Sequence, residues 1–316
     1  MTIQVAQFAE KHLEDAAALF AQRYRQAREL DPFLAPDYES SSVLLPRLKR
    51  LVDAVPGVAV LQGGRLVGFL AAYWLDELRG ERAVYSPEWA NAADVDNARR
   101  IYQAMYAELA AGWVKAGYRA HYLSVLASEP RVLETLHWMS FGMIAVDAVR
   151  DVSPVEAGEA GVEIRQATRD EIRDIVNLNQ ALGRYMAASP IFMVVEECDA
   201  RYYEEWLADS DHHLWLAYRD DEAVGYIQLQ KWYPDSCAVI QDARSVSITG
   251  AFTQERYRGS GVGTALLNQA LSWARSMGFE RCAVDFEPHN PQATTFWLRH
   301  FRPVCYSVVR HVERRI

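Results

Sequence analysis

A glycine-rich turn that runs straight into a helix-forming segment, YRGSGVGTALL at residues 257–267, constrains this chain more than any other feature. Apolar residues recur at helical spacing over residues 263–278, so the turn precedes an amphipathic helix. The first N–H groups of a helix have no partner within it, and the helix dipole adds partial positive charge there. Gly261 and Gly263 let the main chain approach a ligand closely, and Arg258 adds charge at the rim. The turn therefore predicts an anion-binding site.

Three other interpretations of the turn are weaker or less specific. A Walker-type phosphate loop ends in Gly-Lys-Ser/Thr, whereas this loop ends in Gly-Thr without lysine, which excludes that class. A dinucleotide fingerprint has the spacing G-x-G-x-x-G early in a βαβ unit, but here the glycines are each two residues apart and occur late. A tight turn that only lets a helix pack against a strand stays open on the spacing alone.

Composition narrows the class of protein. The chain has 316 residues, enough for two domains, and a net charge of −9 that disfavours nucleic acid as the main partner. Its apolar runs are too short to span a membrane, and its first residues lack the pattern of a signal peptide. The four cysteines are scattered without a CxxC pair, which argues against a zinc site and fits a reducing cytoplasm. We therefore expect a cytoplasmic protein without a metal; whether it forms a homodimer stays open.

Residues 151–161, DVSPVEAGEAG, have no apolar periodicity and are typical of a linker, although a long surface loop within one domain is the alternative. The segments on either side follow a similar order of strands and helices. In the second half we expect strands at residues 162–168, 213–232 (a hairpin), 245–253, 281–288 and 304–312, and helices at 168–182, 263–278 and 291–301. In the first half we expect strands at residues 3–9, 57–75 (a hairpin), 120–127 and 143–152, and helices at 10–30, 95–117 and 129–142. The sequence predicts a mixed α/β fold in two domains, residues 1–152 and 161–316.

The run Arg258-Gly-Ser-Gly-Val-Gly263 matches Q/R-x-x-G-x-G/A, and EPHNPQATTFWLRHF follows at residues 287–301. Both resemble motifs of the GCN5-related N-acetyltransferases (the GNAT family), and the order of elements in residues 162–316 is similar to the whole domain of that family. The resemblance implies two tandem GNAT-like domains, each a mixed, mostly antiparallel sheet flanked by helices. It also implies acetyl-CoA as the cosubstrate and transfer of the acetyl group to an amine. The resemblance does not identify the acceptor, and we expect a primary amine of a small molecule.

The resemblance assigns roles to residues of the second domain. Ala251, Phe252 and Thr253, at the end of the family's fourth strand, are expected to offer backbone hydrogen bonds to the pantetheine arm. The pyrophosphate is expected to bind at Arg258, Gly259, Ser260, Gly261, Val262, Gly263 and Thr264. Asn290 is expected to bond the coenzyme, although an asparagine before Pro291 is also typical of a helix cap. Phe296 is expected to pack against the coenzyme.

The catalytic groups are less clear, because this chain departs from the family's pattern. Many members carry a tyrosine as the second residue of the aromatic pair in the last helix, and here that residue is Trp297. An indole N–H has no useful acidity, so another group or solvent must protonate the leaving thiolate. Tyr306 is our candidate acid, with packing in the core as the competing interpretation. Glu287 is our candidate base, with His289 as the competitor and a solvated carboxylate as the alternative.

The acceptor is not identified by the sequence. Residues 183–213 carry several aromatic residues and carboxylates, and the resemblance implies that this segment lies over the acceptor site. An aromatic and acidic lining would suit a cationic amine, but the same aromatic residues also suit a core. The tryptophan at position 297 motivates an alternative function, a non-catalytic protein that binds or senses acyl-CoA.

The first half lacks the glycine turn. The corresponding segment, YSPEWANAADVDNARRIYQ from Tyr85, has no glycine and contains Glu88, Asp94 and Asp96. Carboxylates beside a helix N-terminus satisfy the dipole themselves and would repel a pyrophosphate. We therefore expect the first domain to be a degenerate copy that does not bind CoA.

Overall fold

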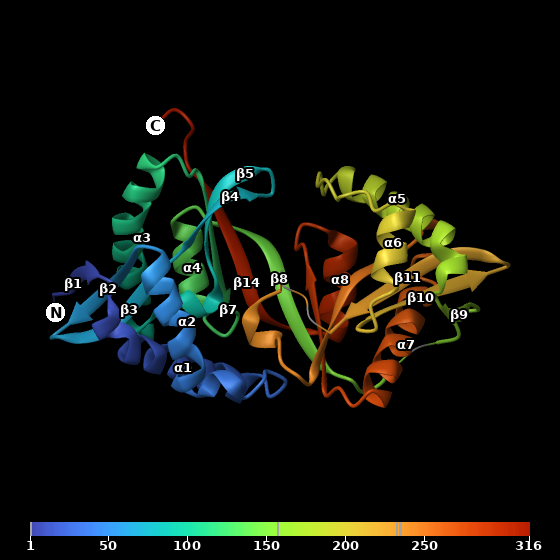
Figure 1. Ribbon diagram of the computed structural model, residues 1–316, viewed down its shortest axis with the longest axis horizontal. Helices are drawn as coiled ribbons and strands as arrows, with labels where there is room; N and C mark the ends of the chain where they lie inside the picture. The colour runs from blue at the N-terminus through green and yellow to red at the C-terminus, as the bar shows by residue number, and fades with distance from the viewer. Residues whose placement is uncertain (1, 157, 232, 234–235) are drawn as a thin grey trace. The chain divides into compact units, whose positions relative to one another are not determined.

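The computed structural model describes residues 2–316 except 157, 232, 234 and 235, so Ala157 of the predicted linker and Trp232 of a predicted strand lie outside it. Two compact units are formed (Figure 1). Unit 1 contains residues 1–147, 237–239 and 303–316, and unit 2 contains residues 148–236 and 240–302. The units differ from the predicted domains in the last part of the chain. Residues 303–316, which contain most of the last strand, belong to unit 1 and not to the unit formed by the second half.

Unit 1 has two sheets, whose strands follow the orders β1-β2-β3-β6 and β4-β5-β7-β14. Within them β5 and β7 are parallel, and the other described neighbours are antiparallel. The hairpin at Gly63-Gly64 is confirmed, because both glycines have the positive φ that such a turn needs. The strands of unit 1 are β1 Gln4–Gln7, β2 Gly57–Gln62, β3 Arg65–Ala71, β4 Tyr73–Leu78, β5 Glu81–Ser86, β6 Asn91–Ala93, β7 Ala120–Leu126 and β14 Arg302–His311. Its helices are α1 Leu13–Leu30, α2 Ser41–Ala54, α3 Ala98–Lys115 and α4 Pro130–Trp138, and the division falls within β8, Gly142–Asp151.

Unit 2 has strands in the order β9-β10-β11-β12-β13, antiparallel except for the parallel pair β12–β13. The predicted mixed, mostly antiparallel sheet is therefore confirmed. Its strands are β9 Glu163–Gln166, β10 His212–Arg219, β11 Glu222–Gln230, β12 Ser245–Thr253 and β13 Arg281–Phe286. Its helices are α5 Ile172–Ala187, α6 Ala200–Trp206, α7 Val262–Ser276 and α8 Pro291–His300.

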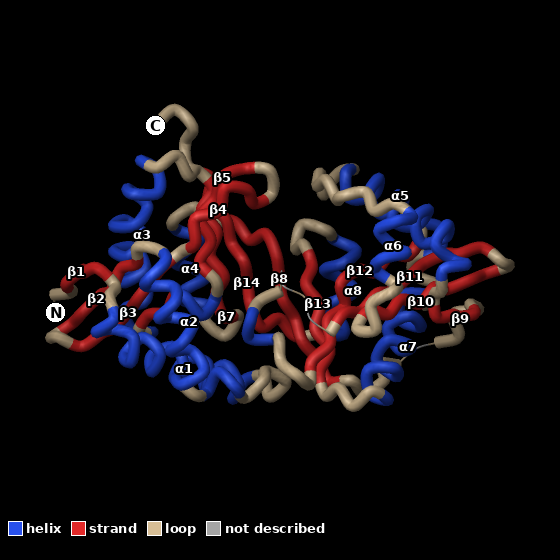
Figure 2. Tube along the Cα trace, viewed as in Figure 1, coloured by secondary structure: helices blue, strands red, loops and turns tan. Residues whose placement is uncertain are grey.

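Helices cover both faces of the sheet of unit 2, as Figure 2 shows. Successive side chains of a strand point to opposite faces, and β10 follows this rule. Leu214 and Leu216 pack in the cluster formed with α5 and α6, whereas Trp215 contacts Trp273 of α7, with 5.5 Å between ring centroids. Both faces of this strand are therefore buried, and for this reason its central residues are consecutive apolar residues.

The β12–β13 pairing ends before either strand does. Paired residues run from Ser245↔Arg281 to Ile248↔Val284, while β12 continues to Thr253 with β11 alone on its other side. A register shift between Gln228 and Leu229 marks a bulge in β12 at the same level. The last residues of β12 thus have one edge that β13 does not use, and this edge lines the cavity described below.

Among the described residues, no helix combines the length and the apolarity that crossing a membrane would require.

Candidate active site

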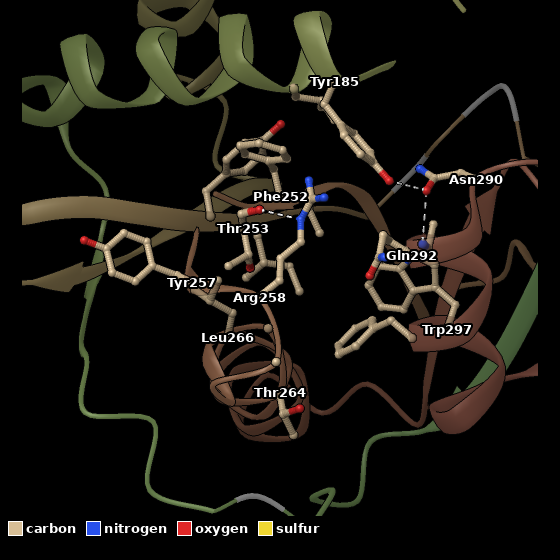
Figure 3. A pocket seen from close by; sticks show the side chains of 18 of the residues that line it. Tyr185, Phe252, Thr253, Tyr257, Arg258, Thr264, Leu266, Asn290, Gln292 and Trp297 are labelled. Carbon is tan, nitrogen blue, oxygen red and sulfur yellow. Dashed lines mark hydrogen bonds between the residues drawn. The ribbon is translucent and has the colours of Figure 1, made fainter. Parts of the chain in front are cut away.

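A cavity of about 350 Å³ opens in unit 2 beside the free edge of β12 (Figure 3). Five elements surround it: β11, the end of β12, the glycine turn with the start of α7, the end of α5 and one face of α8. It is lined by Leu182, Tyr185, Tyr226, Ile227, Ala251, Phe252, Thr253, Tyr257, Arg258, Gly259, Gly261, Gly263, Thr264, Leu266, Asn290, Gln292, Ala293, Phe296, Trp297 and Arg299. The segments that the sequence singled out therefore meet at one site.

Glycine is required at two positions of the turn for conformational reasons. Gly259 has φ = 75° and Gly261, the residue before α7, has φ = 87°. Side chains disfavour this left-handed region, and glycine adopts it without strain. Gly263 is not required in this way, because a Cβ built there would make ordinary van der Waals contact with the ring of Phe296, at 3.4 Å. The turn thus presents the first N–H groups of α7 to the cavity without a side chain in front of them.

Arg258 is fixed at the cavity by a backbone contact and by aromatic rings. Its Nε donates to the carbonyl oxygen of Thr253 at 3.1 Å. Its guanidinium carbon lies 4.1 Å from the ring centroid of Tyr185 and 5.7 Å from that of Phe252. A guanidinium held in this way supplies a positive charge at the same wall as the helix N-terminus.

Asn290 serves both as a helix cap and as part of the cavity wall. Its Oδ1 accepts the N–H of Ala293 at 3.3 Å, which caps α8, and the hydroxyl of Tyr185 at 2.8 Å. The residue is 7% exposed, and its amide nitrogen lies 3.6 Å from the sulfur of Met186. The two interpretations of Asn290 that the sequence left open are therefore compatible.

Tyr185 places a hydroxyl group at the cavity. Burial raises the pKa of this phenol, an effect that the nearby Arg258 charge opposes and the Glu255 charge reinforces. Two other tyrosines line the cavity, but Tyr257 donates its hydroxyl to Glu222 at 2.9 Å, and Tyr226 is 1% exposed. Tyr185 is thus the lining tyrosine whose hydroxyl bonds a second lining residue, as Figure 3 shows.

Two of the twelve predicted binding residues do not line the cavity. Ser260 is exposed and donates its hydroxyl to the carbonyl oxygen of Tyr257 at 2.8 Å. Val262 is 1% exposed and points into the core as the first residue of α7. In both cases the side chain turns away, so any contact with a ligand would come from the backbone.

Neither predicted catalytic residue lines the cavity. Tyr306 is on β14, which pairs with β7, and its ring packs against the core of unit 1. The competing interpretation, packing in a core, therefore describes the environment of Tyr306, and its role as the acid stays an untested prediction. Glu287 is half-buried after the end of β13, and the competing His289 is exposed.

Sequence reasoning missed several lining residues. Gln292 and Arg299 share the face of α8 that carries Phe296, so helical spacing from Phe296 would have found them. Tyr226 and Ile227 come from β11, next to the bulged end of β12, and no local motif marks them. The exposed Arg299 adds a second positive charge to the lining.

The aromatic residues of the predicted acceptor segment divide among three environments. Tyr203 and Trp206 belong to the core of unit 2, as the alternative interpretation supposed. Tyr185 lines the cavity, whereas Phe192 is 74% exposed and Tyr202 is 44% exposed. The segment is therefore neither a continuous aromatic lining nor only a core element.

Residues 180–301 match the model of the Acetyltransferase (GNAT) family. The matched residues include every residue that lines the cavity. A protein of Archaeoglobus fulgidus described as an uncharacterized N-acetyltransferase is 26% identical over 115 residues, which cover 36% of this chain and 74% of that protein.

The likeness to solved GNAT structures extends over the whole chain. A GCN5-related N-acetyltransferase from Sphaerobacter thermophilus has a TM-score of 0.60 at 14% identity, over 98% of this chain and 95% of that one. A tandem GNAT protein from the clavulanic acid biosynthesis pathway has a TM-score of 0.50 at 14% identity, over 98% of both chains. At such identities the likeness shows the fold, and it confirms the predicted tandem GNAT fold.

Unit 1 has a buried ion pair at the position that corresponds to Asn290. Glu129 precedes Pro130 at the start of α4, as Asn290 precedes Pro291 at the start of α8. The Nε of Arg23, on α1, lies 2.5 Å from Oε1 of Glu129, and the two side chains are 9% and 6% exposed. The space they border, with Phe20, Glu88, Asn91, Ala92, Val125 and Leu126, has no volume that a water molecule could enter.

In unit 1 a carboxylate occupies the helix N-terminus that corresponds to the start of α7. Asp94 caps the short helix Val95–Asn97 that leads into α3, with its Oδ1 accepting the N–H of Asp96 at 3.2 Å. This carboxylate therefore takes the place at the helix N-terminus that was predicted for it. Glu88 was placed there wrongly: it is 1% exposed, and its Oε1 accepts the N–H of Val239 at 3.0 Å.

Proposed function

We propose that this chain is an N-acetyltransferase that moves an acetyl group from acetyl-CoA to a primary amine of a small molecule. The observation that carries the proposal is the joining of the glycine turn at the start of α7 to the free edge of β12 in one cavity. The glycine turn at the start of α7 binds a pyrophosphate through N–H groups and the helix dipole. The free edge of β12 offers backbone groups to the amides of a pantetheine arm.

The residues around the cavity divide the binding task. Arg258 and the N–H groups of residues 261–264 hold the pyrophosphate, and Arg299 adds charge for a further phosphate. Ala251, Phe252 and Thr253 bond the pantetheine along β12, and Asn290 bonds it from the opposite wall. Phe296 packs against the arm where it passes α7. The sheet and the helix ends fix all of these groups before the ligand arrives, which lowers the entropic cost of binding.

Acyl transfer from a thioester needs a neutral amine close to the carbonyl, stabilisation of the oxyanion, and a proton for the leaving thiolate. A backbone N–H at the end of β12 is suited to the oxyanion. For the proton we propose Tyr185 in place of Tyr306, because its hydroxyl lies in the cavity wall. Its raised pKa keeps the phenol protonated at neutral pH, as a proton donor must be. The proton of the amine goes to Glu287 or to solvent.

Replacing Tyr185 with phenylalanine is expected to slow thiol release from acetyl-CoA about 100-fold, the usual contribution of a general acid, with little change in acetyl-CoA affinity. Stopped-flow measurement with an excess of an amine substrate gives the rate constant. The control is Tyr257→Phe, which removes a hydroxyl from another lining tyrosine that donates to Glu222. Equal rates for the two variants would exclude Tyr185 as the donor.

Replacing Asn290 with serine separates its two roles. Serine keeps a capping oxygen for α8, so we expect a change in the free energy of unfolding below about 0.5 kcal/mol, measured with urea. The lost amide should weaken acetyl-CoA binding about tenfold, as for one hydrogen bond of about 1.4 kcal/mol. Asn97→Ser is the control, because Asn97 precedes α3 but makes no side-chain capping bond. Unchanged affinity of the Asn290→Ser variant for acetyl-CoA would remove Asn290 from the binding site.

The second candidate function, a non-catalytic acyl-CoA-binding or sensing protein, rests on Trp297. This residue is 7% exposed and packs edge to face on Phe301, so it supplies no acid. A thiol-release assay against a panel of polyamines, amino sugars and arylalkylamines distinguishes the two functions. Acetyl-CoA binding without release above hydrolysis for any amine would favour the sensor.

A further inference from the structure

Three side chains of kinds that can ligate transition metals lie close together in unit 1. They are Asp147 on β8, Cys237 in the segment after β11, and Cys305 on β14. Their carboxylate and thiol ligand atoms all lie within 4.8 Å of one another. The residues are 4%, 4% and 0% exposed, so the cluster is closed to bulk solvent. This group lies outside the cavity of unit 2 and has no role in the proposed acetyl transfer.

Each of these residues comes from a different segment of unit 1. Asp147 is the last residue of the first segment, Cys237 is the first residue of the segment 237–239, and Cys305 belongs to the C-terminal segment 303–316. The short segment is tied to the unit by further bonds: the N–H of Cys237 donates to Asp147 at 2.9 Å and that of Val239 to Glu88 at 3.0 Å. The cluster is therefore at the point where three stretches of chain must be held together.

We propose that Asp147, Cys237 and Cys305 bind one zinc ion that cross-links the three segments of unit 1. Two thiolates and a carboxylate are ligands that Zn²⁺ takes in tetrahedral structural sites, with about 2.3 Å to sulfur and about 2.0–2.2 Å to oxygen. Ions that prefer oxygen, such as Mg²⁺ and Ca²⁺, are disfavoured by two sulfur ligands. The three residues are far apart in the sequence and form no CxxC motif. For this reason the sequence alone argued against a zinc site.

Glu88 is the candidate for the fourth ligand. Its Oε1 is engaged by the N–H of Val239, two residues after Cys237. Its Oε2 is buried and has no hydrogen-bond partner in the part of the chain that the structure describes. A buried carboxylate oxygen without a partner is costly, and coordination of an ion would remove that cost. Glu88 is not one of the three residues whose ligand atoms lie within 4.8 Å of one another, so its carboxylate would have to shift toward the ion.

The first test is the metal content of the full chain. Protein produced with added zinc and dialysed against metal-free buffer is expected to retain about one zinc per chain by plasma mass spectrometry. Replacing zinc by Co²⁺ should produce thiolate-to-cobalt charge-transfer absorption, which reports sulfur ligation directly. A wild-type chain that retains no zinc and shows no such absorption with Co²⁺ overturns the proposal.

The second test uses matched variants. Cys237→Ser and Cys305→Ser are expected to lose the bound zinc and the charge-transfer band, whereas Cys282→Ser, a fully buried cysteine of unit 2, should keep both. If a cysteine variant fails to fold, Asp147→Asn provides the test, because asparagine preserves the shape of the side chain. The zinc affinity of this variant should fall at least tenfold. Equal loss in the Cys282 variant, unchanged affinity in the Asp147 variant, or fewer than four free thiols in the denatured wild-type chain would contradict the site.

Discussion

The double variant Gly261→Val/Gly263→Val is expected to lose acetyl-CoA binding, with affinity at least 100-fold below that of the wild-type chain in calorimetry. Gly261 has φ = 87°, a conformation that a β-branched residue adopts only with strain, so the turn must change shape. A Cβ at Gly263 already lies 3.4 Å from the ring of Phe296, and the branched side chain reaches further into the cavity. Both changes displace or cover the N–H groups that we assign to the pyrophosphate.

The control for this variant is Gly278→Val. Gly278 lies two residues after the last residue of α7 and has φ = 84°, so a valine there imposes the same backbone strain, but it does not line the cavity. Its affinity for acetyl-CoA should stay within about twofold of wild type even if its stability falls by 1–3 kcal/mol. Asp94→Ala in unit 1 should likewise leave the affinity unchanged. Wild-type affinity of the double glycine variant would exclude the turn as the binding site.

The variant Glu129→Ala is expected to lower the free energy of unfolding by about 3–5 kcal/mol, because it leaves the buried guanidinium of Arg23 without its carboxylate. The measurement is urea denaturation followed by the fluorescence of the tryptophans. Glu39→Ala is the control, because Glu39 pairs with Arg28 at a half-exposed position and should cost less than about 1 kcal/mol. Similar losses for the two variants would contradict the structural role of the buried pair.

The double variant Arg23→Met/Glu129→Leu tests the same pair differently. Apolar side chains of similar volume remove both charges together, so its stability should be close to that of the wild-type chain.

Acetyl-CoA should bind the wild-type chain at one site, since the ion pair and Asp94 fill the corresponding places of unit 1. Two equivalent sites in calorimetry would contradict the degenerate role of unit 1.

Local features were predictable because adjacent residues determine them. The strand 245–253 and the first hairpin, which turns at residues 63–64, appear as expected. The same holds for the glycine turn, whose positive φ values and helix start lie within a few residues. Strand β4, by contrast, was not separated from the first hairpin, which was predicted to reach residue 75, because the break after Ala71 leaves the apolar pattern continuous. Strand β5 was not predicted.

The sequence by itself determined the glycine turn before α7, the places of Asn290 and Phe296 at α8, and the absence of such a turn in the first half. These depend on backbone conformation and helical spacing, which are properties of short segments. Only the tertiary structure decided that Tyr185 stands beside Asn290, that Tyr306 packs in unit 1, and that Asp147, Cys237 and Cys305 meet. Such contacts join residues about 70 to 180 positions apart, and strand pairing and core packing, which no local pattern encodes, bring them together.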